Sequence, residues 1–307
     1  MDEKIGSLSI IVPVYNENKN ITELYSHLHG VLEDIVGNLE IIFVNDGSTD
    51  DSMEILSGLA AADKSVKVID FSRNFGHQAA IKAGLSFSKT DAVIIMDADL
   101  QDPPEVLEQL IDKWRKGFEV VYAIRRNRKE SLFLRLLYSL FYRLLNKLSN
   151  VRMPLDSGDF CLLDKKIVSH IVAMPERNIF LRGLRSWVGY RQAGVEYDRK
   201  ERFSGSSKYS FFKLLKLALD GIFSFSVIPL KLSAIFGFVI SIFAFLDIVY
   251  LFFIRMPVKG TTAITVLVLF LGGVQLITIG IVGEYIGRIY DEVKSRPLFI
   301  IKEKINL

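Results

Sequence analysis

The stretch VIIMDADLQDPPE, Val93–Glu105, decides the fold class of this chain of 307 residues. Its apolar start predicts a buried strand. The acidic side chains that follow are Asp97, Asp99, Asp102 and Glu105. Open α/β sheets bind ligands at the carboxyl ends of their parallel strands, and Asp97 and Asp99 are hard oxygen ligands that suit Mg²⁺ or Mn²⁺ held to a diphosphate. The alternative is an acidic turn that caps a helix beginning near Pro103.

Strand-like and helix-like segments alternate on both sides of that stretch. The expected strands are Leu8–Val14, Glu40–Val44, Val66–Phe71, Ala92–Met96 and Val120–Ala123. The expected helices run from Asn20 or Thr22 to about Val36, from NDGSTDDS to about Ala62, from about Gly76 to Ser88, and from about Pro104 to Lys116. Such alternation predicts an α/β fold, a mostly parallel sheet with helices on both faces. Neither G-x-G-x-x-G nor G-x-x-x-x-G-K-[ST] occurs, which disfavours dinucleotide and P-loop sites.

Composition limits the class of protein. Half of the residues are hydrophobic and the net charge is only +3, so we expect no nucleic-acid partner. Cys161 is the single cysteine, which excludes an intrachain disulfide. The first residues, MDEKIGSLSI, lack a basic region followed by an apolar one, so we expect no cleavable signal peptide.

The second half contains two long apolar stretches. Ser233–Ile254 and Ala263–Tyr285 are each long enough to cross a hydrocarbon core of about 30 Å. The short linker between them predicts a helical hairpin in the membrane. The excess of Lys and Arg on both outer flanks predicts that both termini, and the α/β domain before the hairpin, lie in the cytoplasm at the cytoplasmic membrane. The alternative is a buried hairpin in a soluble core.

Polar residues and cationic stripes add detail to this membrane region. Asp247 and Gln275 are costly in lipid, so we expect them to pair within the hairpin or between the subunits of a homo-oligomer. The segments 131–150 and 208–228 combine apolar faces with cationic stripes, which favours helices at the membrane surface over core helices. The expected division is a cytoplasmic α/β domain over 1–207, an interfacial segment over 208–228, a hairpin over 229–287 and a cytoplasmic tail over 288–307.

Three polar loops should meet at one edge of the sheet. They are PVYNE at 13–17, NDGSTDD at 45–51 and DADLQD at 97–102. Glu17 and Asp46 are acceptors suited to the hydroxyls and N–H groups of a nucleoside. Gly47 allows close backbone approach, and Ser48 or Thr49 can cap the next helix. Together these loops predict a site for a sugar nucleotide.

The sequence resembles the family 2 glycosyltransferases of GT-A fold. Within them it is similar to the bacterial polyisoprenyl-phosphate glycosyltransferases, which include bactoprenol glucosyltransferases and relatives of dolichol-phosphate mannose synthase. The matching stretches are IIVPVYNE, VNDGSTDDS, SRNFGHQAA, MDADLQDPPE, DSGDFCLLD, RFSGSSKY and the hairpin. The resemblance implies inverting transfer of one sugar from a UDP-sugar to undecaprenyl or another polyprenyl phosphate at the cytoplasmic face.

The resemblance also implies roles for particular residues. The nucleotide pocket would contain Pro13, Tyr15, Glu17, Asp46 and Asp97. The Mg²⁺ or Mn²⁺ would be held by Asp97, Asp99 and Gln101. Asp159 stands where the family has its candidate base, and it joins Asp99 as a catalytic residue. Cys161 departs from the family pattern, where Arg often follows the Asp-Phe pair.

The acceptor itself bears on the mechanism. A phosphate monoester has a second pKa near ~6 and is largely dianionic at neutral pH, so it needs a base less than a hydroxyl does. Cationic side chains should steer it, and the candidates are Arg125, Arg128, Arg202 and Lys208. The alternative for these cations is a solvated basic face beside anionic lipid. His77, at an expected helix start, is either catalytic or a residue that positions its loop.

Two other readings and the choice of sugar stay open at this point. A processive polysaccharide synthase would carry Q-x-x-R-W and more spans, and the sequence has neither. A non-catalytic membrane scaffold that binds sugar nucleotides would not need the acidic loops. Glucose is the expected sugar, with N-acetylglucosamine, galactose, mannose and an aminoarabinose derivative as alternatives.

Overall fold

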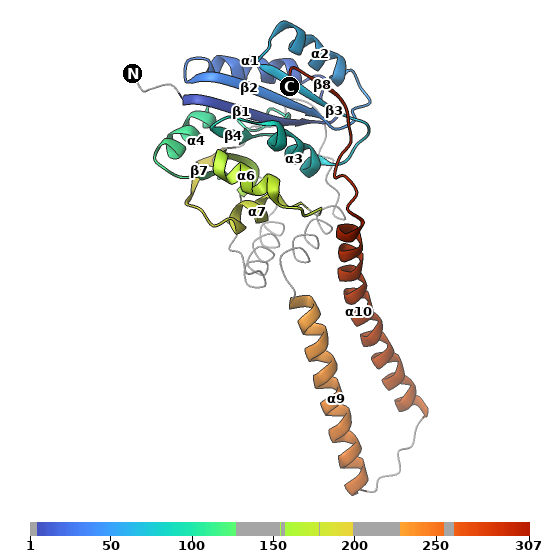
Figure 1. Cartoon of the computed structure of the whole chain (residues 1–307). Coiled ribbons are helices and arrows are strands. Elements are labelled where there is room, and N and C mark those ends of the chain that lie inside the picture. The colour runs from blue at the N-terminus through green and yellow to red at the C-terminus, as the bar shows by residue number, and fades with distance from the viewer. Residues whose placement is uncertain (1–4, 127–153, 155–156, 178, 199–227, 255–260) are drawn as a thin grey trace.

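The computed structural model describes residues 5–126, 154, 157–177, 179–198, 228–254 and 261–307 (Figure 1). The expected interfacial segments 131–150 and 208–228 lie outside these residues, apart from Ile228. Arg128, Arg202 and Lys208 lie outside them as well.

A single sheet of eight strands organises the described part of the chain. The strands are β1 Ile5–Val14, β2 Val36–Asn45, β3 Val66–Phe71, β4 Ala92–Ile95, β5 Val120–Arg125, β6 Ser157–Asp164, β7 Gln192–Tyr197 and β8 Ile301–Ile305. Their order is β7-β5-β6-β4-β1-β2-β3-β8. Only β6 and β8 run antiparallel to their neighbours. The expected mostly parallel sheet is therefore confirmed.

Helices cover both faces of the sheet, as expected. They are α1 Ile21–Leu32, α2 Ser52–Ala62, α3 His77–Phe87, α4 Val106–Arg115, α6 Lys165–Ala173 and α7 Leu181–Trp187. Apolar side chains of α1, α2 and α4 pack in one core cluster. Those of α3, α6 and α7 pack in a second cluster. Successive strand residues alternate between the two clusters, for example Ile10 and Ile11, because side chains of a strand point to opposite faces.

The first helix is shorter than the sequence predicts. We expected it to reach about Val36, but α1 ends at Leu32 and Val36 already begins β2. Val36 pairs with Ile5 at the start of β1, so strand pairing across the sheet extends β2 backwards. The expected cap is also wrong, because α2 begins at Ser52 and neither Ser48 nor Thr49 is its N-cap residue.

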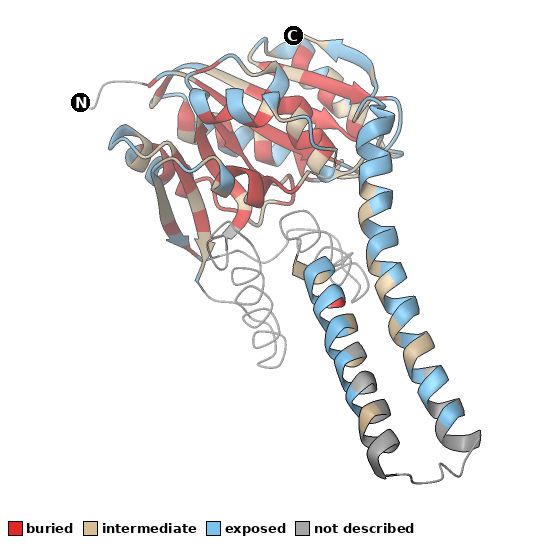
Figure 2. Cartoon of the chain, turned by 60° about the horizontal axis from the view of Figure 1, so that its bottom comes forward, coloured by how far each residue is buried: buried red, intermediate tan, exposed pale blue. Residues whose placement is uncertain are grey.

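The two helices before β8 form a long helical hairpin. The helices α9 (Ile228–Ile254) and α10 (Thr261–Lys294) lie side by side and extend away from the sheet domain (Figure 1). Within the described residues, Phe270–Lys294 is long and apolar enough to cross a membrane by length and composition. Figure 2 shows the contrast between the buried strands and the exposed hairpin. Exposed apolar side chains such as Phe243 and Ile277 make water an unfavourable surrounding for this surface.

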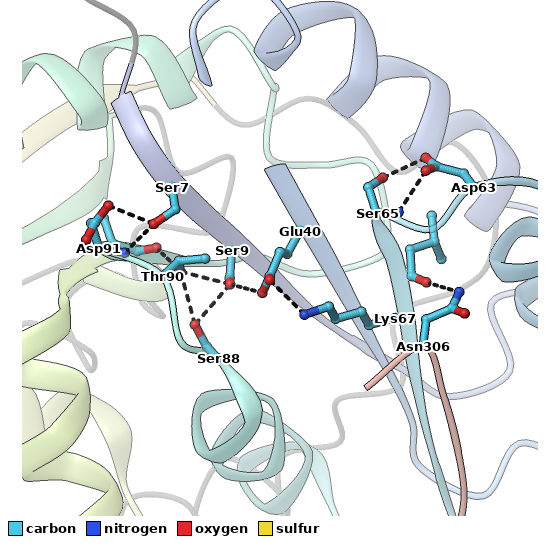
Figure 3. A network of polar contacts seen from close by, with 12 residues as sticks. Ser7, Ser9, Glu40, Asp63, Ser65, Lys67, Ser88, Thr90, Asp91 and Asn306 are labelled. Carbon is cyan, nitrogen blue, oxygen red and sulfur yellow. Dashed lines mark hydrogen bonds and ion pairs between the residues drawn. The ribbon is translucent and has the colours of Figure 1, made fainter. Parts of the chain in front are cut away.

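A polar network lies in the amino-terminal half of the sheet (Figure 3). The hydroxyls of Ser88 and Thr90 each donate to Ser9 Oγ at 2.9 Å. Ser9 Oγ donates to Glu40 Oε2 at 3.1 Å, and Glu40 pairs with Lys67 at 2.7 Å. The network satisfies polar groups within a sheet that is covered on both faces. The acidic loops lie at the carboxyl ends of the strands, away from this network.

The close approach of α3 to the sheet requires a glycine. A Cβ at Gly84 would lie 2.4 Å from Ile11 Cγ2, whereas nothing lies within 4 Å of a Cβ at Gly58 on α2. We therefore expect Gly84→Ala to lower the free energy of unfolding by about 1–3 kcal/mol through overpacking. Gly58→Ala, the matched control, should leave it unchanged or raise it by roughly 0.5–1 kcal/mol. Urea unfolding in detergent measures both, and equal stabilities would contradict this packing argument.

Candidate functional site

The expected polar loops do meet at the carboxyl ends of the strands. Asn16, in the left-handed region with φ 56°, ties the loop after β1 to the loop after β2. Its backbone N–H donates to Ser48 Oγ at 3.0 Å, and its side-chain oxygen accepts from the Thr49 N–H at 2.8 Å. Ser48 and Thr49 therefore fasten two loops together at the site edge.

The residues expected around the nucleotide differ in exposure. Pro13 is buried within β1, opposite Val44. Tyr15 is 40% exposed directly after the end of that strand. Glu17 accepts a hydrogen bond from Asn20 Nδ2 at 2.6 Å, just before α1 begins. Tyr15 is thus the member of this set that offers an open surface to a ligand.

Asp46 holds the loop 72–76 in place. Its carboxylate accepts from the Phe75 N–H at 2.6 Å and from the Gly76 N–H at 3.0 Å. It is only 3% exposed, and this burial raises its pKa although the two amide bonds act in the opposite direction. Gly47 allows the two loops to touch, because it has φ 66° and its Cβ would lie 2.5 Å from the Arg73 carbonyl carbon.

The Asp97–Asp102 loop contains acids of different kinds. The Asp97 side chain is 35% exposed, whereas Asp99 is 6% exposed and accepts from the Gln101 N–H at 3.2 Å. Leu100 between them has φ 58°, a conformation that costs a non-glycine residue about 1–3 kcal/mol. Asp102 is buried and accepts from the Tyr197 hydroxyl of β7. Asp97 is therefore the acid that this loop presents outward.

Asp159 lies near Asp97. The antiparallel register of β4 and β6 ends at the pair Ile95 and Cys161, two residues before Asp97 and two residues after Asp159, and His77 contacts both acids. The Asp159 carboxylate accepts from Arg182 Nε at 2.9 Å and from Gln78 Nε2 at 3.1 Å. Burial alone would raise its pKa, but Arg182 and His77 hold the pKa of this carboxyl well below its usual range. Asp159 is accordingly a stable carboxylate and a weak base.

His77 lies between the two acids at the start of α3. Its Nε2 is 3.6 Å from Asp97 Oδ1 and 3.7 Å from Asp159 Oδ2. Partial burial favours the neutral ring, yet the contact with Asp159 and the charge of Asp97 raise the pKa of His77 to about 8. The ring is thus largely cationic at neutral pH, and it links the two carboxylates.

Two members of this cluster escaped the sequence reasoning. They are Arg182, which lies on α7, and Gln78, which lies on α3 and connects the start of α7 to Asp159. The Gln78 amide donates to Asp159 and accepts from the Leu181 N–H at 3.0 Å, the first residue of α7. Gln78 lies in the matching stretch SRNFGHQAA, but that stretch does not predict its contact with Asp159. Arg182 belongs to no such motif, and its role follows only from long-range packing. The composition of FLRGLRSW, with two arginines beside apolar residues, is the sole signal that the sequence offers.

Arg125 reaches the same region from the end of β5. Its guanidinium lies beside Gly158, the residue before Asp159: a Cβ added to that glycine would be 3.4 Å from Arg125 Nη2. Its Nε donates to the Tyr197 hydroxyl at 3.4 Å. The neighbouring Arg126 instead pairs with Glu196 at 3.4 Å on the surface. Arg125 is therefore the one expected acceptor-binding cation that the described residues bring to the site.

The carboxylates fit a divalent cation that shares its ligands with a substrate. No group of three His, Cys, Asp or Glu side chains is assembled for a metal within the described residues. Mg²⁺ is commonly held by one or two carboxylates together with substrate phosphates. Asp97 and Asp99 can supply this smaller set, so a metal here would depend on a phosphorylated ligand for its other oxygens.

Known proteins match the chain along nearly its full length. The model for glycosyl transferase family 2 matches residues 9–172, and the model for the GtrB C-terminal hairpin matches residues 228–289. An uncharacterized glycosyltransferase of Bacillus subtilis (strain 168) is 45% identical over 304 residues, covering 97% of this chain and 94% of that protein.

Other relatives carry a more specific name. The SfII prophage-derived bactoprenol glucosyl transferase of Shigella flexneri is 43% identical, covering 96% of this chain and 97% of its own. A prophage bactoprenol glucosyl transferase homolog of Escherichia coli (strain K12) is 42% identical, covering 96% and 98%. The crystal structure of a mycobacterial protein shares the fold at a TM-score of 0.50 and 19% identity, covering 71% and 73%.

The acidic loops of an α/β sheet, the apolar hairpin and these full-length matches agree with one another. The chain therefore belongs to glycosyl transferase family 2.

Proposed function

We propose that this protein transfers one sugar, glucose, from UDP-glucose to a polyprenyl phosphate at a membrane surface. The observation that carries the proposal is the outward-facing Asp97 opposite the Asp159–Arg182 pair, in a chain that continues into an apolar hairpin. The names of the Shigella and Escherichia relatives support the lipid acceptor and glucose.

The donor nucleotide would lie over the loops after β1 and β2. Tyr15 offers an exposed ring on which a uracil base can stack. Asp46 supports the pocket from below, because its carboxylate holds the amides of the loop 72–76. Pro13 shapes the end of β1, and Glu17 supports the start of α1.

The UDP leaving group would be held by a divalent cation on the Asp97–Gln101 loop. Asp97 and Asp99 are the proposed ligands, and Gln101 the proposed third. Mg²⁺ or Mn²⁺ in this place would neutralise the charge that develops on the diphosphate as the sugar departs. The His77 ring lies on the same side, with its Nε2 3.6 Å from Asp97 Oδ1.

The acceptor phosphate would attack without losing a proton first. One of its oxygens forms a bond to the anomeric carbon while the bond from that carbon to UDP breaks, and the electron pair leaves on the diphosphate. In-line attack inverts the configuration. Because Asp159 is fixed by Arg182 and Gln78, we assign it to orienting Arg182 toward the acceptor, and Asp99 to holding the leaving group. Arg125, Arg128, Arg202 and Lys208 are the proposed cations for the acceptor phosphate.

The hairpin would set the reaction at the cytoplasmic membrane. We assign residues 1–207 to the catalytic domain, 208–228 to the membrane surface, 229–287 to a two-span hairpin and 288–307 to the cytoplasmic side, where β8 joins the sheet. Both termini are then cytoplasmic. Gln275 is exposed on α10 of the single chain, which favours a homo-oligomer that covers it in lipid.

The function is tested with the full-length protein in detergent. Incubation with UDP-[¹⁴C]glucose and undecaprenyl phosphate should release UDP and move label into the organic phase. Undecaprenol, which lacks the phosphate, should accept no label. UDP release that does not depend on the lipid would favour a hydrolase, and preference for another UDP-sugar would contradict the assignment of glucose.

Metal dependence gives a second prediction. Asp97→Asn keeps the shape of the side chain but removes the charged ligand, so we expect kcat to fall by at least roughly 100-fold. Excess EDTA should abolish transfer by the wild type, and added Mg²⁺ or Mn²⁺ should restore it. Asp91→Asn, at the amino-terminal end of β4 and so at the opposite end of that strand from Asp97, is the matched control and should retain wild-type kcat. Full activity in chelator would contradict the metal assignment.

The pH profile tests the role of Asp159. Its lowered pKa means that the carboxylate stays ionised throughout the range above pH 5, so it cannot produce an acidic limb near pH 6. We assign that limb to the acceptor phosphate, whose second pKa is about 6. Asp159→Asn should lower kcat and keep the limb, measured from pH 5 to 9. Loss of the limb in Asp159→Asn would identify Asp159 as an obligate base.

A further inference from the structure

The chain returns from the hairpin to the catalytic sheet. After α10 ends at Lys294, residues 301–305 form β8, which pairs antiparallel with β3 at the edge of the sheet (Figure 1). Val68 pairs with Ile305, and Phe71 with Ile301. The Ser72 N–H donates to the Ile300 carbonyl at 3.0 Å. The end of the membrane hairpin is therefore bonded to the strand that leads into the loop 72–76.

A row of aromatic rings continues this connection into the site. Phe299 stacks on Phe71, with ring centroids 5.1 Å apart and planes 10° apart. Phe71 is only 2% exposed and meets Phe75 edge to face at 5.7 Å. Each such pair contributes about 0.5–1.5 kcal/mol beyond the area that it buries. Phe299 thus packs against Phe71, and Phe71 in turn contacts Phe75 of the loop 72–76.

The last ring of the row belongs to the loop that Asp46 holds. The Phe75 and Gly76 amides donate to the Asp46 carboxylate, and His77 follows at once at the start of α3. His77 lies within 3.7 Å of both Asp97 and Asp159. A displacement of Phe75 would therefore move the residue that links the two site acids.

A second contact joins the end of α10 to the segment that leads to α7. Glu292, in the last turn of α10, accepts from the Arg177 N–H at 2.9 Å. Arg177 lies in the connection that leads to α7, the helix that carries Arg182. The end of α10 and the residues that follow it therefore contact, respectively, the connection to α7 and the strand that leads into the loop 72–76.

We propose that residues 296–307 position the active-site loop 72–76 relative to the membrane hairpin, with Phe299 as the positioning residue. Catalysis requires reacting groups to be held closely, and a displacement of about 1 Å can cost roughly 100-fold in rate. The simpler role for β8 is to cover the edge of β3, since exposed edges invite aggregation. The two roles differ in whether Phe299 matters more than the rest of the strand.

Hydrogen exchange on the full-length protein in lipid nanodiscs separates these roles without reference to activity. Phe299→Ala should accelerate exchange of the Phe75 and Gly76 amides roughly three- to tenfold, the factor that corresponds to one aromatic pair. Amides in the middle of β1 should not change. Phe299→Tyr, which keeps the stacked ring, should restore the wild-type rates.

The matched control is Ile305→Ala. Ile305 packs on the core at the far end of the same strand, opposite Val68, and Asn306 beside it bonds the Ala60 and Val66 carbonyls (Figure 3). Ile305→Ala should accelerate exchange near those residues and leave Phe75 and Gly76 unchanged. If both variants accelerate the same amides equally, or if Phe299→Ala leaves Phe75 and Gly76 unchanged, the proposal is wrong.

The activity measurement rests on the proposed function. Phe299→Ala should lower kcat roughly tenfold, while Ile305→Ala and Phe299→Tyr should stay within about twofold of the wild type. A wild-type kcat for Phe299→Ala together with accelerated exchange would overturn the positioning role. Absence of transfer in the wild type itself would instead count against the proposed function, and the exchange result would still decide whether the tail holds the loop.

Discussion

The rest of the site depends on keeping a carboxylate charged inside the protein. Asp159 has a side chain that is only 14% exposed, and an unpaired charge in such a place is strongly destabilising. Arg182 and Gln78 satisfy it, and they come from α7 and α3 respectively. Because β6, α3 and α7 all have to converge for this pairing, one electrostatic requirement fixes three elements and sets the positions of His77 and the Asp97 loop beside them.

Burial sorts the acidic residues of this edge into different tasks. Asp46 and Asp102 are almost fully buried and are used by the protein itself, one to hold backbone amides and the other to receive the Tyr197 hydroxyl. Asp159 is largely buried and paired with Arg182. Asp97 keeps a third of its surface exposed. All four residues are aspartates, so the environment of each, rather than its residue type, distinguishes a structural carboxylate from one that is available to a ligand.

The sequence predicts most of this fold because the first five strands are apolar runs that end in recognisable polar loops. It also predicts the end of the sheet at which the Asp97 loop lies, and the family resemblance names Asp159 as a candidate base without placing it. It does not reveal β6–β8 as strands, because DFCLL, QAGVEY and IKEKI are short and their pairing partners are distant in sequence. Arg182 and Gln78 are missed for the same reason, since a contact between residues 78 and 159 leaves no local pattern. The early end of α1 shows strand pairing overriding helix propensity.

The position of β8 bears on the order in which the protein can be completed. The chain leaves the sheet after β7 at one edge, runs through the hairpin and closes the opposite edge with β8. While the ribosome is still making the hairpin, β3 therefore has no partner on that side, and Phe71 lacks the ring that later stacks on it. An open strand edge is a site for pairing with other chains. Completion of the sheet thus has to wait until the hairpin and the residues after it have been made, and a truncation that ends before α9 removes the last strand together with the hairpin.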